Sequence, residues 1–419
     1  MNNVPPPERF RLLCVACGAS PRASGPPFVC DQCGKALALQ LDLERLSGSL
    51  SRETIQGRQQ GLARYWEFLP VERPADLVSL GEGGSPLQRC THLESTLDVA
   101  PLSAKNEGTN PTGTFKDRSA ALGVSRAKKV EAPGVVIASD GNAGPATAAY
   151  CARAGLPCYV LMPAYAYRER FAQTRMFTER LFALEGDIND CIELAERLSR
   201  ANGWYHTTTA GIADAYQAEG PKTIAYEIFE RLAFQAPHWL VAPVGGGGLL
   251  AALWRAAKEW LGLGWIDRMP RFVAVQAAGC APLVREFERG GEGLALEPCK
   301  QIETKAITIA VPDPPDAVPA LRAIRETGGT AVAVSDEEIE YAQSLLASRE
   351  GILAEPAGVA SLAGVIRLRR EGLIAKADSV VFLVTGSGLK ELSTLAATVP
   401  LPQPISLEQA YRSLARERR

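Results

Sequence analysis

The segment that decides the fold of this chain spans residues 110–118 and reads Asn110-Pro111-Thr112-Gly113-Thr114-Phe115-Lys116-Asp117-Arg118. Three polar loops follow it, and they read Ser139-Asp140-Gly141-Asn142-Ala143-Gly144, Pro243-Val244-Gly245-Gly246-Gly247-Gly248 and Thr385-Gly386-Ser387-Gly388. In this order the four segments supply an amine nucleophile, a polar side-chain anchor, a run of backbone amides that can cradle a phosphate, and a hydroxyl. Together these are the parts needed to hold pyridoxal phosphate as a Schiff base.

Short apolar segments precede three of these loops. We expect strands at residues 135–138, 158–162, 239–242, 272–275 and 380–384, and helices at residues 145–154 and 249–260. This alternation predicts an α/β protein whose parallel sheets are covered on both faces by helices. Because sites in such folds lie beyond the carboxyl ends of the strands, the loops after them are expected to line one site.

The composition is that of an ordinary soluble globular protein, with 46% hydrophobic and 22% charged residues among 419. The formal net charge of -2 and the sequence pI near 6.1 give no reason to expect nucleic acid or an anionic membrane as a partner. No apolar run approaches the ~20 residues of a membrane helix. The N-terminal residues lack the apolar core of a signal peptide, so we expect a cytoplasmic protein.

Four of the ten cysteines form two close pairs near the N-terminus. Cys14-x-x-Cys17 and Cys30-x-x-Cys33 are separated by twelve residues, and a glycine follows the second cysteine of each pair. This spacing is typical of a tetrahedral zinc site with four thiolate ligands, and such a closed site is structural. The alternatives are two unligated pairs or disulfides, and the missing export signal favours zinc. We expect buried free thiols at the other positions, Cys90, Cys151, Cys158, Cys191, Cys280 and Cys299.

Residues 110–118 resemble the cofactor-lysine motif of threonine synthases, within the tryptophan-synthase-β-like family of pyridoxal-phosphate enzymes. The likeness extends to the cysteine pairs and to residues 64–70, 79–87, 331–338, 355–357 and 385–390. Agreement at so many ordered segments identifies the chain as a member of this family. The resemblance implies two doubly wound parallel-sheet domains with the cofactor between them, and a zinc-ribbon-like N-terminal unit.

The expected domain boundaries follow from this comparison. Residues 1–45 form the zinc-ribbon-like unit, residues 46–115 and 211–399 the large cofactor-binding domain, and residues 116–210 the smaller domain that carries the asparagine loop. Residues 41–65 are expected to be helical, and residues 400–419 to form a charged, partly frayed tail. The resemblance further implies a homodimer that acts on a small amino-acid substrate.

Roles for the first two loops also follow from the resemblance. Lys116 is expected to bind the cofactor, release it to the substrate and then act as the base at Cα, once burial has lowered its pKa. Asn142 is expected to hydrogen-bond the cofactor's phenolic oxygen. Ser139, with the amides of Asp140 and Gly141, is expected to receive the substrate carboxylate at a helix N-terminus, where partial positive charge favours anions.

The other two loops are expected to bind the phosphate and the ring of the cofactor. Gly245, Gly246, Gly247 and Gly248 lie between a strand and a helix, where bare amides and the helix dipole favour phosphate. The Thr385 hydroxyl is expected to face the pyridine nitrogen. Because a hydroxyl does not force protonation of that nitrogen, this partner suits elimination and replacement at Cβ or Cγ better than transamination.

The substrate segment departs from the family pattern. Threonine synthases commonly carry Asn-Ser-x-Asn-Pro-x-Arg here, to hold the phosphate of O-phosphohomoserine. Aligned on Glu219-Gly220-Pro221-Lys222-Thr223, this chain has Gly211, Ile212, Asp214 and Gln217 at the asparagine, serine, second asparagine and arginine positions. Glutamine cannot replace the charge of an arginine fork, and an aspartate would repel a phosphate. Either the substrate lacks a phosphate, or the loop is misaligned.

Asp140 and Ser387 are further departures, because the family usually has Ser or Thr at the first position and His at the second. Asp140-Gly141-Asn142 resembles the Asp-Gly-Asn of diaminopropionate ammonia-lyases, in which the aspartate is an acid/base group. The alternative is an aspartate that caps the following helix from outside the site.

The function expected from these residues is that of a threonine-synthase-like lyase, which converts O-phospho-L-homoserine and water to L-threonine and phosphate. One alternative is a β-eliminating ammonia-lyase or dehydratase acting on diaminopropionate, serine or threonine, or a β-replacement enzyme of specialised metabolism. The other alternative is a degenerate homologue that binds cofactor or a partner without catalysis. The intact Lys116, Asn142 and tetraglycine argue against degeneration.

Overall fold

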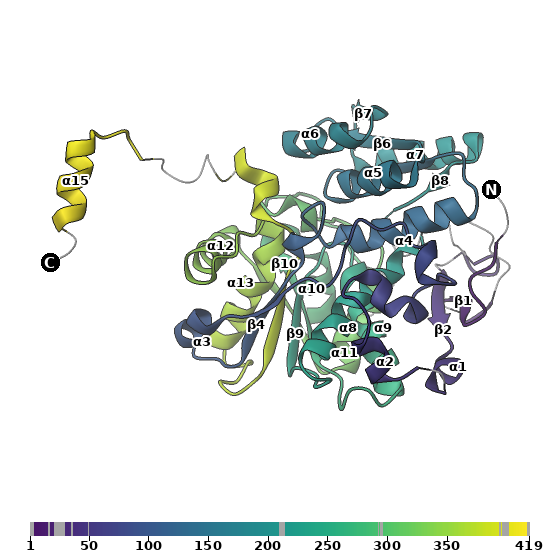
Figure 1. Cartoon of the computed structure of the whole chain (residues 1–419), viewed down its shortest axis with the longest axis horizontal. Helices are drawn as coiled ribbons and strands as arrows, with labels where there is room; N and C mark the ends of the chain where they lie inside the picture. The colour runs from purple at the N-terminus through teal and green to yellow at the C-terminus, as the bar shows by residue number, and fades with distance from the viewer. Residues whose placement is uncertain are drawn as a thin grey trace.

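A computed structural model describes residues 4–15, 17–20, 30–34, 37–48, 50–208, 214–291, 293, 296–393, 395 and 402–416 of the chain. Within these ranges the strands form three sheets, which are a two-stranded hairpin, a sheet of six strands and a sheet of four (Figure 1). α-Helices pack against both the six-stranded and the four-stranded sheet, as the alternating sequence pattern predicts.

The six-stranded sheet has the order β11-β10-β9-β12-β4-β3. Its strands are β3 (Leu87–Arg89), β4 (Leu102–Asn106), β9 (Trp239–Pro243), β10 (Arg271–Ala277), β11 (Thr330–Val334) and β12 (Val380–Val384). All neighbours pair in parallel except β3, which runs antiparallel at the edge. Both β9 and β12 are buried along their whole length, which explains their uninterrupted apolar sequences. After β9 the chain continues to β10, which pairs with one edge of β9, whereas β12 pairs with the other edge. The loops after β9 and β12 therefore flank a topological switch point.

The four-stranded sheet is parallel throughout and has the order β7-β6-β5-β8. Its strands are β5 (Val135–Ala138), β6 (Cys158–Pro163), β7 (Leu181–Leu184) and β8 (Tyr205–His206). The strands expected at residues 135–138, 158–162, 239–242, 272–275 and 380–384 are therefore confirmed to within a few residues.

Ten α-helices with these bounds belong to the two larger sheets within the described ranges: α3 (Thr91–Leu97), α4 (Lys116–Lys129), α5 (Ala143–Ala154), α6 (Arg168–Phe177), α7 (Ile188–Asn202), α8 (Lys222–Arg231), α9 (Gly248–Gly262), α11 (Ala317–Glu326), α12 (Asp336–Glu350) and α13 (Pro356–Arg370). A further helix, α10 (Pro282–Glu288), packs near β10 and β11. Single-turn helices include η3 (Glu107–Thr109), η4 (Gln217–Glu219), η6 (Ile307–Ile309) and η7 (Gly388–Glu391).

The N-terminal hairpin pairs β1 (Phe10–Cys14) with β2 (Leu37–Leu41) in antiparallel register. Its alternate residues Phe10, Leu12 and Leu39 are buried and belong to the same hydrophobic cluster as Tyr65 and Trp260 of the main body. The hairpin therefore shares its core with the large α/β unit.

The single helix expected at residues 41–65 is wrong. The structure has α1 (Leu43–Ser47), α2 (Arg52–Gln56) and η1 (Leu62–Phe68) in its place. Gly48 and Gly57 are the C-caps of the first two helices, and the Ser51 side chain accepts a hydrogen bond from the amide of Thr54 to begin the second. These local caps outweigh the helical periodicity.

The C-terminal segment contains α15 (Leu407–Arg416), which lies apart from the sheets in Figure 1. Within the described ranges, no helix combines the length and the apolar character that a membrane span requires.

Candidate active site

Lys116 is the first residue of α4, and the loop before it is fixed by the loop that follows β12. The amide of Phe115 donates to the carbonyl oxygen of Thr385 at 3.0 Å, and Thr114 forms an isolated β-bridge with Gly386. Asp117 accepts from both the amide and the hydroxyl of Thr112, at 2.9 and 2.8 Å. The lysine loop and the Thr385 loop are therefore one hydrogen-bonded unit, although 269 positions separate Lys116 from Thr385 in the numbering.

Arg118, at the end of the lysine motif, anchors the start of α4 in the core. Its guanidinium binds Glu107 at 2.7 Å and Glu227 at 2.6 Å, and Lys105 binds Glu227 at 2.5 Å. The four side chains are 0–2% exposed. Two cations and two anions balance one another, as buried charges must. The ion pairs of Arg118 therefore fix the start of α4 and, with it, the position of the neighbouring Lys116.

Burial lowers the pKa of Lys116 to about 8, and the carboxylates of Asp316, Asp140 and Glu355 oppose this shift. A lysine with such a pKa carries a substantial fraction of neutral, nucleophilic amine near neutral pH. The three carboxylates give the lysine an acidic environment. Neither Asp316 nor Glu355 was among the site residues expected from the sequence.

The asparagine loop follows β5 and leads into α5. Ser139 accepts hydrogen bonds from the amides of Gly141 and Gly144, at 3.2 and 3.0 Å, so its hydroxyl shapes the loop and caps the helix. Asn142 directs its Nδ2 to Glu355, and its buried Oδ1 has no partner among the described residues. An unpaired acceptor in a buried site needs a ligand group to satisfy it.

Asp140 lies in the same loop, next to the lysine. Burial raises the pKa of its carboxyl group, and the charge of Lys116 acts in the opposite direction. Because Ser139 supplies the side-chain cap of α5, the capping interpretation of Asp140 loses its main support. Its electrostatic coupling to Lys116 favours a place inside the site.

The tetraglycine follows β9 and forms the N-terminus of α9. Among the described residues, no acceptor binds the amide N–H groups of Gly245, Gly246, Gly247 and Gly248. Gly247 has φ +97°, and a Cβ there would lie 2.6 Å from the carbonyl oxygen of Asp316. A Cβ at Gly245 would meet Val311 at 3.0 Å. Free amides at the N-terminus of a helix suit an anion such as a phosphate.

Thr385 is 4% exposed at the end of β12. Its carbonyl oxygen accepts from the lysine loop, and the described residues offer its hydroxyl no hydrogen-bond partner. The structure thus places the four sequence-predicted loops at adjoining carboxyl ends of strands.

Glu355 is the N-cap residue of α13. It lies in one of the segments that resemble the family, but the sequence did not predict a site role for it. Its amide donates to the carbonyl oxygen of Gly386 at 3.1 Å, and its carboxylate accepts from Asn142. The Glu-Pro pair before a helix was the available signal, because proline at the first helical turn places the preceding residue at a helix N-terminus. Asp316 gave no such signal in its proline-rich segment.

The substrate segment is described in part. Asp214 is fully buried and accepts hydrogen bonds from the Tyr205 and Thr207 hydroxyls and from the amides of Tyr216 and Gln217. Burial raises the pKa of Asp214 to about 6, and these donors oppose the shift. Gln217 is also buried and accepts from Thr207. Both residues are committed to internal contacts, so Asp214 is a loop-stabilising residue and Gln217 supplies no charge. The other two positions, Gly211 and Ile212, lie outside the described residues.

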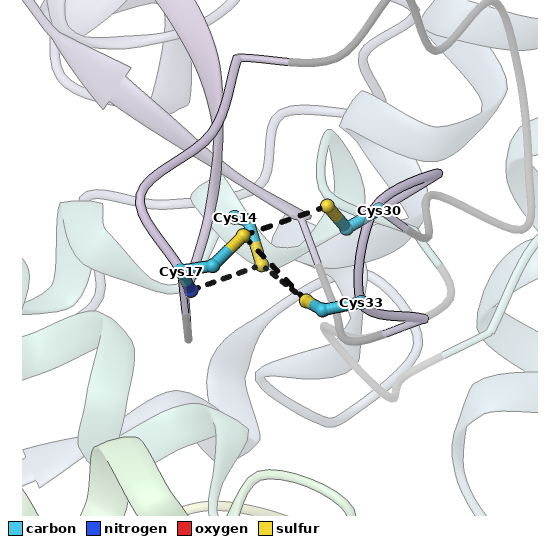
Figure 2. A group of neighbouring side chains, drawn as sticks. All are labelled: Cys14, Cys17, Cys30 and Cys33. Carbon is cyan, nitrogen blue, oxygen red and sulfur yellow. Dashed lines mark hydrogen bonds between the residues drawn. The ribbon is translucent and has the colours of Figure 1, made fainter.

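The four N-terminal cysteines converge at the end of β1 (Figure 2). Their Sγ atoms lie within 4.8 Å of one another, with 3.4 Å between Cys14 and Cys33 and 3.7 Å between Cys17 and Cys30. A tetrahedral zinc with Zn–S bonds near 2.3 Å requires Sγ separations of ~3.8 Å. The glycines after each pair, Gly18 and Gly34, adopt φ +70° and +69°. Backbone amides also approach the thiols of Cys14 and Cys30, as in metal-binding knuckles. The remaining six cysteines are free, and five of them are buried.

These features fit pyridoxal phosphate. The tetraglycine presents free amides at a helix N-terminus, and the unpaired Asn142 Oδ1 and the Thr385 hydroxyl offer polar contacts. Lys116 supplies an amine of lowered pKa.

Comparison with known proteins gives the same cofactor. The family model described as "Pyridoxal-phosphate dependent enzyme" matches residues 78–386. Threonine synthase of Methanocaldococcus jannaschii is 38% identical over 396 residues, covering 94% of this chain and 96% of that protein. Threonine synthase of Methanosarcina acetivorans is 36% identical, with coverage of 92% and 93%.

Solved structures share the fold at lower identity. Processed threonine deaminase isoform 2 of Solanum lycopersicum superposes with a TM-score of 0.64 at 21% identity, over 76% of this chain and 88% of that chain. Maize serine racemase gives a TM-score of 0.63 at 17% identity, over 80% and 92%. With a family match over most of the chain and threonine synthases as full-length relatives, this protein belongs to the pyridoxal-phosphate-dependent enzymes and is a lyase of the threonine-synthase-like kind.

Proposed function

We propose that this enzyme binds pyridoxal phosphate at Lys116 and removes a leaving group from Cβ or Cγ of a small amino acid. The observation that carries this proposal is that the lysine, asparagine, tetraglycine and Thr385 loops lie together between the two α/β units. When bound, the cofactor supplies an electron sink for the negative charge that develops at Cα. The amides of Gly245–Gly248 bind its phosphate, and the Thr385 hydroxyl is a neutral partner for the ring nitrogen.

In the reaction of the relatives, O-phospho-L-homoserine and water give L-threonine and phosphate. For that reaction Lys116 holds and moves protons at Cα and Cβ of the substrate, because its pKa of about 8 allows both protonation states near neutral pH. Phosphate then leaves from Cγ, Cγ takes up a proton to become the methyl group of threonine, and the hydroxyl of water is added at Cβ. Ser139 shapes the helix N-terminus at which the substrate carboxylate binds. Similarity to threonine synthases over nearly the whole chain supports this assignment.

A second substrate class is favoured by the carboxylates around Lys116. Asp140, Asp316 and Glu355 all act on the lysine electrostatically, and the two described positions of the substrate segment supply no cation. An amino or hydroxyl leaving group at Cβ suits this acidic site better than a dianionic phosphate. Asp140 would then protonate the departing group in a β-elimination, as an ammonia-lyase or dehydratase requires.

A paired assay of the purified enzyme separates the candidates. Phosphate release from O-phosphohomoserine supports the threonine synthase reaction, whereas ammonia and a keto acid from diaminopropionate, serine or threonine support β-elimination. A protein with neither activity nor the visible absorbance of lysine-bound cofactor would be a degenerate homologue.

We further propose that the four cysteines hold one structural zinc ion, and that the enzyme is a cytoplasmic homodimer. The inter-sulfur distances of 3.4–3.7 Å support the metal, because they are too long for disulfide bonds and close to those around tetrahedral zinc. Light scattering of the holoenzyme tests the dimer, and a monomeric mass would contradict it.

A further inference from the structure

The carboxylate of Glu355 lies between the two α/β units beside the proposed cofactor site. Asn142 donates its Nδ2 to both oxygens of Glu355 at 2.9 and 3.0 Å, and Arg170 donates to Oε2 at 3.0 Å. Glu355 precedes α13 of the six-stranded sheet, whereas Asn142 and Arg170 come from α5 and α6 beside the four-stranded sheet. The three residues are 2%, 6% and 0% exposed. The contacts are therefore shielded from water and join the two units.

The backbone around Glu355 leaves room for this carboxylate. A Cβ on Gly386 would lie 2.1 Å from Glu355 Oε1, and a Cβ on Gly358 would lie 2.9 Å from the backbone of Gly386. Gly386 directly follows Thr385, the expected partner of the cofactor ring. The loop that carries a cofactor contact is thus packed against the Glu355 carboxylate.

The carboxylate also decides which way the Asn142 amide points. An ionised carboxylate accepts hydrogen bonds and donates none, so it selects the Nδ2 side of the amide. Oδ1 is thereby turned away, and it is the buried atom without a partner among the described residues. An asparagine without Glu355 would be free to present either edge to a ligand.

Arg170 holds the carboxylate in place from the other side. Its guanidinium also binds Glu391 at 2.8 Å and the carbonyl oxygen of Lys390 at 2.8 Å, both in η7. These bonds exist together when α6 lies against η7. The contact between α6 and η7 therefore completes the support of Glu355.

We infer that Glu355 is a positioning residue, which holds the Asn142 amide with Oδ1 as the edge that faces the phenolic oxygen of the cofactor, and which is itself held by Arg170. This inference rests on the proposed binding of pyridoxal phosphate at Lys116. It adds a residue that touches the asparagine and acts on the cofactor through it. It also links the contact with the cofactor to the contact between the two units.

The test uses the holoenzyme and follows the pH dependence of its visible absorbance, because a hydrogen bond to the phenolic oxygen alters the apparent pKa of that band. Glu355→Gln is expected to shift this pKa by about one unit, the effect of one lost hydrogen bond. It should also lower kcat about tenfold or more, with KM within about twofold of the native value. Asn142→Ala should shift the band in the same way. The double variant should be no more affected than Asn142→Ala, since the two residues act as one unit.

The matched control is Glu391→Gln, which also removes a carboxylate from Arg170 but makes no contact with Asn142. It should leave the band's pKa unchanged. If Glu355→Gln does not fold, Gly386→Ala displaces the carboxylate without removing its charge and should give the same spectral shift. Additive effects of Glu355→Gln and Asn142→Ala would overturn the inference. So would an unchanged band in Glu355→Gln, or an equal shift in Glu391→Gln. Failure of the proposed function would give a different result. If the native protein never gained the band when cofactor was added, the assignment of Lys116 itself would be wrong.

Discussion

Arg118 and Glu227 form a buried ion pair at 2.6 Å, two residues beyond Lys116 and 109 residues apart in sequence. Arg118→Met should lower the free energy of unfolding by about 3–5 kcal/mol, because the carboxylates of Glu107 and Glu227 would remain buried without their main partner. Denaturant unfolding of the holoenzyme measures this loss. The control is Arg200→Ala, which removes an exposed pair with Glu196 and should cost about 0.5 kcal/mol. Equal losses in the two variants would contradict the anchoring role.

Cofactor loading should depend on pH in a way set by Lys116. With a pKa of about 8, roughly one tenth of the amine is neutral at pH 7, on the order of 100-fold more than for an ordinary lysine. When pyridoxal phosphate is added to the unloaded enzyme, the rate at which visible absorbance appears should rise with pH, reach half its maximum near pH 8 and level off above that. A model amine in the same buffers corrects for titration of the cofactor. Lys116→Ala should gain no band, and a rate that still rises steeply above pH 9 would exclude the lowered pKa.

The tetraglycine should not accept a side chain at Gly247. Gly247→Ala places a Cβ 2.6 Å from the backbone oxygen of Asp316 at φ +97°, so the loop must shift and its amides must move. Cofactor affinity should fall about 10- to 100-fold, equivalent to roughly 1–3 kcal/mol of strain. Gly155→Ala is the control, because it has φ +69° with nothing within 4 Å of the added Cβ. Equilibrium titration of the unloaded variants with pyridoxal phosphate compares the two.

Asp140→Asn should lower turnover more than it weakens substrate binding, if the carboxyl group protonates a leaving group from Cβ. A loss of about 100-fold in kcat with little change in KM is expected for an acid/base group. Asp187→Asn serves as the control, because it removes the same charge from the exposed N-cap of α7 and asparagine caps a helix equally well. Steady-state kinetics with diaminopropionate, serine and phosphohomoserine decide the case. Efficient threonine production from phosphohomoserine by the native enzyme would show that another group binds the phosphate.

The purified enzyme should contain one zinc per chain. Cys33→Ser should lower the metal content and the unfolding temperature together, because metal binding contributes directly to folding of such units. Cys299→Ser, at a partly exposed cysteine far along the chain, should change neither. Metal analysis with thermal unfolding measures both effects. A metal-free native protein of full stability would contradict a structural zinc site at the four cysteines.

Local sequence was sufficient to predict the strands and loops that line the site. The run Val380–Val384 is buried throughout and ends at a glycine-containing turn, so the strand and its loop are both visible in the residues themselves. The contacts made by Arg118 and Arg170 were not predictable in this way. Arg118 ends the lysine motif and Arg170 lies in a polar stretch, but neither local sequence indicates that the partners Glu227 and Glu355 lie 109 and 185 residues further on. Buried charges depend on tertiary pairing, which local periodicity does not encode.

The N-terminal hairpin places Phe10, Leu12 and Leu39 in the same apolar cluster as Tyr65 and Trp260. A metal ion at its tip would therefore hold together part of the enzyme's own interior. Cells starved of zinc would lose this enzyme through unfolding and proteolysis, with no change at the catalytic lysine. The supply of a metal that takes no part in the chemistry would then set how long each molecule survives.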